Sequence, residues 1–332
     1  MLYVDGNAGW YKPKRATVIG GTLALAIAAA ILSTKAGASC TPPPVWRKLL
    51  ATLPFRESPM TTIPLDRIGI DVGRTLRLED AVDWAAGSGV GIIDIQLDTG
   101  ANVVTSFDAA RAHAIRRSCD HHDIRLGLHT LSAVNVAEYA PLVGDAVDAY
   151  LRAYIDAAVL LGAEWIVVHA GFHFSADIPR RMQAGLDRLR RAADHAEHKS
   201  VLLLLENLNK EPADAEVHYL AHTIEEWRWF YDKLDSPALR LSFTANHAHL
   251  VPEGVEGFLN AMPLSRVGEV RLADCFRNGH EQHLVPGQGD FDFPALFTAL
   301  EAKGYAGHYM NAFGSLDDML TARARFAGIA VG

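Results

Sequence analysis

Cysteine is scarce in this chain: Cys40, Cys119 and Cys275 are its only three cysteines, and they lie far apart in the sequence. Three scattered thiols exclude a disulfide framework and a zinc site built on thiolates. Basic stretches are missing as well, since 31 Lys and Arg face 39 Asp and Glu and give a formal net charge of -8. Without a basic stripe, a nucleic-acid partner is disfavoured.

A glycine-rich dinucleotide-binding loop is also absent where one would be needed. The apolar run at 68–72 and the residues after it read "IGIDVGRTL". This stretch lacks the G-x-G-x-x-G spacing of a Rossmann fingerprint. We therefore expect no nucleotide cofactor, and a doubly wound open sheet becomes the less favoured architecture.

Long hydrophobic runs are rare, and one uncharged run of membrane-spanning length lies near the N-terminus, at residues 16–34. Lys12, Lys14 and Arg15 precede it, which is typical of a signal peptide or signal anchor. A membrane tether through 16–34 would make the protein membrane-anchored or exported if residues 1–40 are translated. Alternatively, Met60 opens a cytoplasmic domain and 1–59 is an untranslated extension. Either way, we predict an N-terminal segment with a linker over 1–59 and a folded domain over 60–332.

After Met60, short apolar runs alternate with longer amphipathic ones. Near-continuous hydrophobic runs are typical of parallel strands that are buried on both faces. Glycines are predicted to end several of the intervening helices, for example at Gly87 and Gly162. Eight strand–helix units in this length predict a (β/α)8 TIM barrel. The predicted strands are 68–72, 91–97, 124–129, 165–171, 201–207, 239–243, 267–274 and 307–313.

Polar side chains collect at the ends of these runs, where a barrel has its functional face. The candidates are His129, His169, Glu206, Asn207, Thr244, His247, Arg271, Glu281, His283 and Asn311. Neutral imidazole and carboxylate are the usual ligands of zinc, manganese or iron in such a setting. Glu206 closes the run "VLLLL", so its carboxylate needs a compensating partner. The pattern predicts a polar site at one end of the barrel and raises the question of a divalent metal.

Residues 66–330 resemble the xylose-isomerase-like barrel superfamily, which includes sugar phosphate isomerases and epimerases and the endonuclease IV branch. The motifs that carry the resemblance are the "HT" after the third strand, "VVHAG", "LLLEN", "NHAHL", "RLAD" and "HLVPGQGDFDF". Their common order and spacing make the match more specific than any single motif. The resemblance implies a small carbohydrate-like substrate, and it leaves the oligomeric state open.

In the isomerases and epimerases, the resemblance implies one metal held by Glu, Asp, His and Glu at strands five to eight. Here these positions fall on Glu206, Thr244, Arg271 and Asn311. Three of the four ligands are missing, and the guanidinium of Arg271 would place a positive charge almost on the metal position.

The endonuclease IV branch adds two flanking metal positions. These are matched by one triad of His129, His169 and Glu206, and by another of His247, Glu281 and His283. Three hypotheses follow: an isomerase or epimerase, a metal-assisted hydrolase or lyase, and a non-catalytic sugar-binding relic. For the first, Glu206, Arg271 and His247 are the predicted catalytic residues. His129, His169, Asn207 and Asn311 are the predicted substrate-binding residues.

Overall fold

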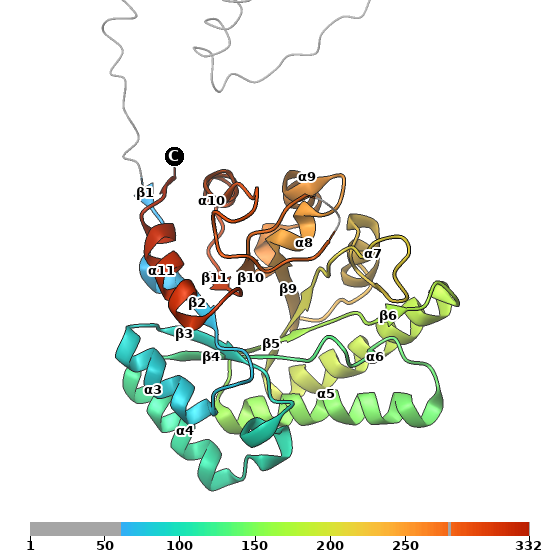
Figure 1. Ribbon diagram of the computed structural model, residues 1–332. Coiled ribbons are helices and arrows are strands. Elements are labelled where there is room, and N and C mark those ends of the chain that lie inside the picture. Colours follow the sequence, from blue (N-terminus) through green and yellow to red (C-terminus); the bar gives the residue numbers. More distant parts are fainter. Residues whose placement is uncertain (1–60, 278–279, 332) are drawn as a thin grey trace, which may run out of the picture. The chain divides into compact units, whose positions relative to one another are not determined.

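The computed structural model describes residues 61–277 and 280–331, and Figure 1 shows their arrangement. The predictions for residues 1–59, including the tether through 16–34 and the domain boundary after residue 59, lie outside the described residues. Within the described ranges, no helix combines the length and the hydrophobicity needed to cross a membrane.

Eight parallel strands close into a barrel, as the sequence predicts. In chain order they are β2 (Ile68–Asp71), β3 (Ile92–Ile95), β4 (Arg125–His129), β5 (Trp165–Val168), β7 (Leu202–Glu206), β9 (Leu239–Thr244), β10 (Val267–Leu272) and β11 (His308–Asn311). The barrel closes because β2 pairs with β11 on one side, Ile70 against Asn311, and with β3 on the other, Ile70 against Ile93. The (β/α)8 prediction is confirmed.

Helices follow the strands and cover the outside of the barrel (Figure 1). They are α3 (Leu78–Ser88), α4 (Ala109–His122), α5 (Pro141–Leu161), α6 (Ile178–Lys199), α7 (Ile224–Tyr231), α8 (Ala245–His249), α9 (Gly254–Ala261), α10 (Phe293–Ala302) and α11 (Leu316–Ala327). Short 3-10 helices are η1 (Leu65–Arg67), η2 (Gly100–Asn102), η3 (Val104–Ser106) and η4 (Leu264–Arg266). Two small sheets pair β1 (Thr61–Thr62) with β12 (Ala330–Val331), and β6 (Phe172–His173) with β8 (His218–Tyr219).

Glycine in the left-handed conformation ends two of the helices, one of them at a predicted position. Gly162 caps α5 with a φ of 70°. Gly87 lies inside α3, which continues to Ser88 and is capped by Gly89 with a φ of 64°. The prediction for Gly87 was wrong because the left-handed conformation that ends this helix is adopted two residues later.

The barrel interior is built in layers along its axis. Ile92, Trp165, Val167, Leu204 and Met310 form a separate apolar cluster that begins at the first residues of β3 and β5. Because side chains alternate along a strand, the next inward positions toward the other end are polar on several strands. This alternation places acidic, basic and imidazole groups between the apolar cluster and the C-terminal face of the barrel.

Gly127 on β4 makes room for the largest side chain of that apolar cluster. A Cβ at Gly127 would lie 2.1 Å from Cε2 of Trp165. We expect Gly127→Ala to lower the free energy of unfolding by about 1–3 kcal/mol, because the overpacked indole must move. Urea unfolding measures this change. Gly87→Ala is the matched control, since its Cβ would meet nothing within 4 Å. A helical Ala there should stabilise by about 0.5–1 kcal/mol. Equal effects of both substitutions would contradict the packing argument.

Candidate functional site

A polar cavity of about 300 Å³ opens at the C-terminal ends of the barrel strands. Its lining includes Asp71, His129, His169, Glu206, His247, Arg271, Glu281 and His283. Seven of these eight residues are candidates named from the sequence, and the barrel brings them to one place because all parallel strands end on the same face.

The first of two clusters in this cavity contains His129, His169 and Glu206. The Nε2 atom of His169 lies 3.2 Å from Nε2 of His129 and 3.0 Å from Oε2 of Glu206. The third side of this triangle, from His129 Nε2 to Glu206 Oε2, measures 3.6 Å. Tetrahedral zinc with bonds of about 2.0–2.1 Å would place ligand atoms roughly 3.3 Å apart. The three atoms therefore have the spacing of ligands around one small cation.

The hydrogen bonds behind this cluster decide which ring nitrogen faces it. Thr130 donates its hydroxyl proton to the carbonyl of Val167, so its Oγ1 accepts from Nδ1 of His169 at 3.2 Å. In neutral His169, the Nε2 lone pair then faces the carboxylate of Glu206. Two groups that both present lone pairs at 3.0 Å need a cation between them, either a proton or a metal ion.

The pKa values of the cluster follow from burial and from the contacts between its members. Burial and Arg271 oppose protonation of His129, but Asp71 and Glu206 outweigh them and raise its pKa to about 9. Burial dominates for His169 and lowers its pKa. Burial opposes ionisation of Glu206, yet the hydrogen bonds with the two imidazoles hold its pKa well below the usual range. Glu206 is therefore ionised at neutral pH, as a ligand or a base requires.

The second cluster contains His247, Glu281 and His283. Oε1 of Glu281 lies 3.1 Å from Nε2 of His247 and 2.7 Å from Nε2 of His283. Both imidazoles donate from Nδ1 to backbone carbonyls, His247 to Asn207 and His283 to Ala312. In the neutral rings both Nε2 lone pairs again converge on one carboxylate. Such outer hydrogen bonds are what orients histidine ligands at metal sites.

A single buried carboxylate fixes the loop that carries Glu281 and His283. Asp274 accepts backbone N–H bonds from Cys275 and Phe291 through Oδ1, and from Gly287 and Gly289 through Oδ2. Four bonds to one side chain hold both ends of the loop against β10. The sequence names Asp274 only as part of the "RLAD" motif, without this role.

Arg271 occupies the floor of the cavity as the centre of a buried ionic layer. Its guanidinium contacts the carboxylates of Asp71 and Asp94, and it lies 3.0 Å from Oε1 of Glu269. These contacts hold the pKa of Asp71 at about 2 and that of Glu269 at about 2, although burial opposes ionisation of both. Burial dominates for Asp94 and raises its pKa to about 8. The positive charge predicted for this position is present, and three acidic groups surround it.

Two predicted substrate-binding residues turn away from the cavity. The side-chain amide of Asn207 bridges to the backbone of Thr244, and that of Asn311 donates to the carbonyl of Met319 on α11. Neither residue lines the cavity, whereas Ala312 does. Asn311 therefore does not face the cavity, although its predicted binding role requires this. The predicted position is off by one residue, and one residue along a strand moves a side chain to the opposite face. At the strand-eight position of the resemblance, the cavity-facing residue is Ala312.

Sequence reasoning missed the acidic partners of Arg271. Asp94 and Glu269 are buried and Asp71 is partly exposed; all three lie inside apolar runs, and none of them closes a motif. The signal that could have identified them is alternation: "IGID", "IIDI" and "VGEVRL" each place a charge on the inward face. A buried Arg implies carboxylates nearby, but which ones it meets depends on how the barrel closes.

Both triads offer three nitrogen or oxygen ligand atoms that lie within 4.8 Å of one another. Their imidazole nitrogens and carboxylate oxygens fit zinc, manganese or iron. The central position of the isomerases and epimerases does not fit a metal, because Thr244 donates its hydroxyl to Glu206 and Arg271 provides a cation of its own. A third group of possible ligands among the described residues, Asp71, Asp94 and His129, already has Arg271 in contact with both of its carboxylates, so the flanking triads are the better candidates for a metal.

A family model described as a xylose isomerase-like TIM barrel matches residues 82–314. No curated protein is significantly similar to the chain in sequence.

Solved structures share the fold at low sequence identity. A D-tagatose 3-epimerase-like protein has a TM-score of 0.67 and 19% identity, covering 79% of this chain and 96% of its own. D-psicose 3-epimerase from Clostridium cellulolyticum H10 has a TM-score of 0.64 and 18% identity, with coverages of 79% and 96%. An AP endonuclease of family 2 from Brucella melitensis has a TM-score of 0.63 and 16% identity, with coverages of 80% and 99%. At these identities the likeness shows the fold alone.

Proposed function

Because the chain belongs to the family of xylose isomerase-like TIM barrels, we propose that it is an isomerase or epimerase that moves a proton next to a carbonyl group. The proposed substrate is a small sugar, polyol or keto-acid, in keeping with a polar cavity of about 300 Å³. The observation that carries the proposal is the convergence of two imidazole nitrogens and one carboxylate oxygen, from His129, His169 and Glu206, within 3.6 Å of one another.

The charge of each residue determines its proposed role in the reaction. A divalent metal held by His129, His169 and Glu206 would polarise a substrate oxygen. Glu206, ionised at neutral pH, is the proposed base. His247 lies beside this base, with 3.8 Å between its Nδ1 and Oε1 of Glu206, and the Asn207 carbonyl that accepts from Nδ1 holds the ring in place. The guanidinium of Arg271 faces the cavity floor and stabilises the negative charge that develops on the enediolate oxygen.

A metal-assisted hydrolase is the second candidate, and a specific observation favours it. The cluster of His247, Glu281 and His283 is a second set of three ligand atoms with one side open to the cavity. Three protein ligands and an open position are the arrangement of a catalytic zinc that activates water. Proton transfer next to a carbonyl does not need this second cluster.

Solvent deuterium distinguishes the two reactions. The purified chain with Zn²⁺ or Mn²⁺ is incubated in D₂O with D-tagatose, D-psicose, D-fructose and hydroxypyruvate, and mass spectrometry follows exchange. We expect deuterium at the carbon next to the carbonyl, with the exchange rate lowered about 10²–10⁴-fold in Glu206→Gln because the base is lost. Cleavage of ester or phosphoester substrates without exchange would support the hydrolase. Sugar binding with neither reaction would indicate a binding relic and overturn the proposal.

A further inference from the structure

A second cavity, of about 530 Å³, lies at the opposite end of the barrel. We call it the basal cavity. The strands contribute to it with residues at or near their N-terminal ends: Ile92, Arg125, Trp165, Leu202, Arg240, Val267 and His308. The apolar cluster and the ionic layer around Arg271 separate it from the polar cavity. None of the roles assigned above to the polar cavity uses these residues.

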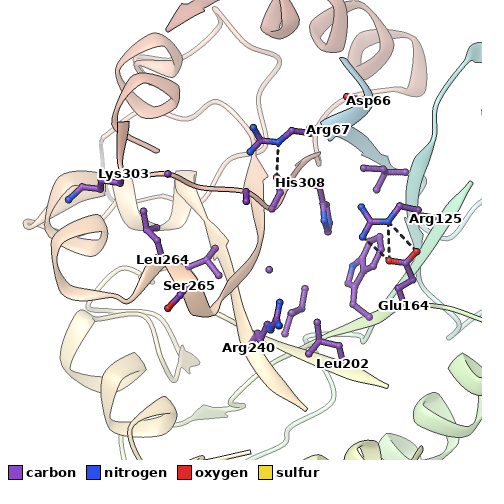
Figure 2. A pocket seen from close by; sticks show the side chains of 18 residues that line it. Asp66, Arg67, Arg125, Glu164, Leu202, Arg240, Leu264, Ser265, Lys303 and His308 are labelled. Carbon is purple, nitrogen blue, oxygen red and sulfur yellow. Dashed lines mark hydrogen bonds and ion pairs between the residues drawn. The ribbon is translucent and has the colours of Figure 1, made fainter. Parts of the chain in front are cut away.

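The basal cavity combines an apolar floor with a basic rim. Ile92, Trp165, Leu202 and Leu204 supply the floor. Figure 2 shows the charged side chains entering from different sides of the opening. Four of them are cationic and two anionic, in a chain whose formal net charge is -8. The cations are Arg67, Arg125, Arg240 and Lys303, and the anions are Asp66 and Glu164.

Two of the cations are already paired with carboxylates and two are not. Arg67 contacts Glu301 at 3.0 Å, and Arg125 contacts Glu164. Among the described residues, the ammonium group of Lys303 has one hydrogen bond, to the side-chain amide oxygen of Asn260. In the part of the chain that the structure describes, the exposed guanidinium of Arg240 makes no hydrogen bond or ion pair. The unpaired positive charge of the rim therefore belongs to Arg240 and Lys303.

The floor also contains a donor without an acceptor. Trp165 is 2% exposed, and its Nε1–H is buried with no hydrogen-bond partner among the described residues. Its ring lies 4.5 Å from that of His308, measured between centroids. A buried polar group that lacks a partner is unusual in a folded protein, and it lies here in the wall of a cavity.

We infer that the basal cavity binds a small organic anion. Its carboxylate or phosphate group meets Arg240 and Lys303 at the rim, and its apolar body lies against Trp165 and Leu204. A charged end and an apolar end are both required, because the cavity offers unpaired cations at its rim and hydrocarbon at its floor. An inorganic anion would satisfy only the rim.

A chain of contacts connects this site with the polar cavity. Nε2 of His308, in the wall of the basal cavity, lies 3.0 Å from Oε2 of Glu269. The other oxygen of Glu269 accepts from Arg271, which in turn contacts Asp71 at the edge of the polar cavity. An occupant that shifts His308 therefore changes the position of the guanidinium at the floor of the polar cavity. The inferred role of the anion is that of an effector.

Calorimetric titration of the full chain tests the binding. We expect saturable binding of benzoate, weaker binding of inorganic phosphate, and none of the neutral benzyl alcohol. Arg240→Glu should weaken benzoate binding at least about tenfold with an unchanged melting temperature, because it reverses an exposed, unpaired charge. Arg240→Lys should retain binding. Arg117→Glu is the matched control, since it reverses an exposed charge on α4 that does not line the cavity. No benzoate binding, or equal binding in Arg240→Glu, would overturn the site.

Imidazole resonances test the effector role without any assay of activity. Saturating benzoate should shift the ring ¹⁵N signals of His129, whose Nδ1 lies 3.9 Å from Oδ2 of Asp71, in the wild-type chain. In His308→Gln, which interrupts the contact with Glu269, the same occupancy should leave these signals unchanged. Binding with no shift in the wild-type chain would overturn the effector role, and this outcome is separate from the fate of the proposed isomerase activity.

Discussion

Substitution of Glu206 by glutamine is expected to lower the affinity of the purified chain for Zn²⁺ by at least about 100-fold. Glutamine keeps the size of the side chain but removes the anionic oxygen that faces His129 and His169. Two imidazoles then remain, too few ligands to compete with water for a divalent cation. Equilibrium dialysis against a chelator, followed by elemental analysis, measures the affinity.

Glu281→Gln is the matched control for this substitution. It makes the same chemical change in the second cluster and leaves the first one intact. Each variant should keep about one equivalent of metal per chain at the cluster that it retains, if both clusters bind. Wild-type affinity in Glu206→Gln, with a folded protein, would show that the triad of His129, His169 and Glu206 is a hydrogen-bonded group only.

Substitution of Arg271 by methionine is expected to lower the free energy of unfolding by about 3–5 kcal/mol. Methionine fills a similar volume but leaves Asp71, Asp94 and Glu269 without their cation. Arg271 and Asp94 are nearly completely buried, so water cannot replace the lost contacts. Arg271→Lys should recover part of the loss, because one ammonium cannot reproduce the contacts of a planar fork with three carboxylates.

The stability difference between Arg271→Met and the wild-type chain should depend on pH. The folded-state pKa values of Asp71 and Glu269 are lowered to about 2. A lowered pKa contributes stability above the unfolded-state values of about 4, and this contribution is lost as the pH falls toward 2. The difference should therefore be largest at neutral pH and narrow in acid. Urea unfolding at several pH values measures it.

Arg190→Met is the control for the loss of an ion pair as such. Arg190 pairs with Asp187 on the surface of α6, and both side chains are about half exposed. Exposed pairs of this kind contribute about 0–1 kcal/mol. If Arg271→Met cost no more than Arg190→Met, the buried ionic layer would have no special role in stability.

The strands and the face that carries the site were predictable because they depend on local pattern. Mainly apolar runs marked all eight strands, and the candidate residues lay toward the C-terminal ends of these runs or in the loops that follow them. The orientation of single side chains was less predictable. Asn311 and Ala312 are neighbours, and only the register of β11 against β2 and β10 decides which of them faces the cavity.

By itself, then, the sequence determined the barrel, the face of its site and the residue types of the two histidine–carboxylate clusters. These follow from hydrophobic period and from polar residues at strand ends, which neighbouring residues specify. The tertiary structure decided which groups meet. Arg271 contacts Asp71 across 200 residues of sequence because the last strands close against the first. The basal cavity is likewise formed by the opposite ends of many strands together, so no single stretch of sequence could reveal it.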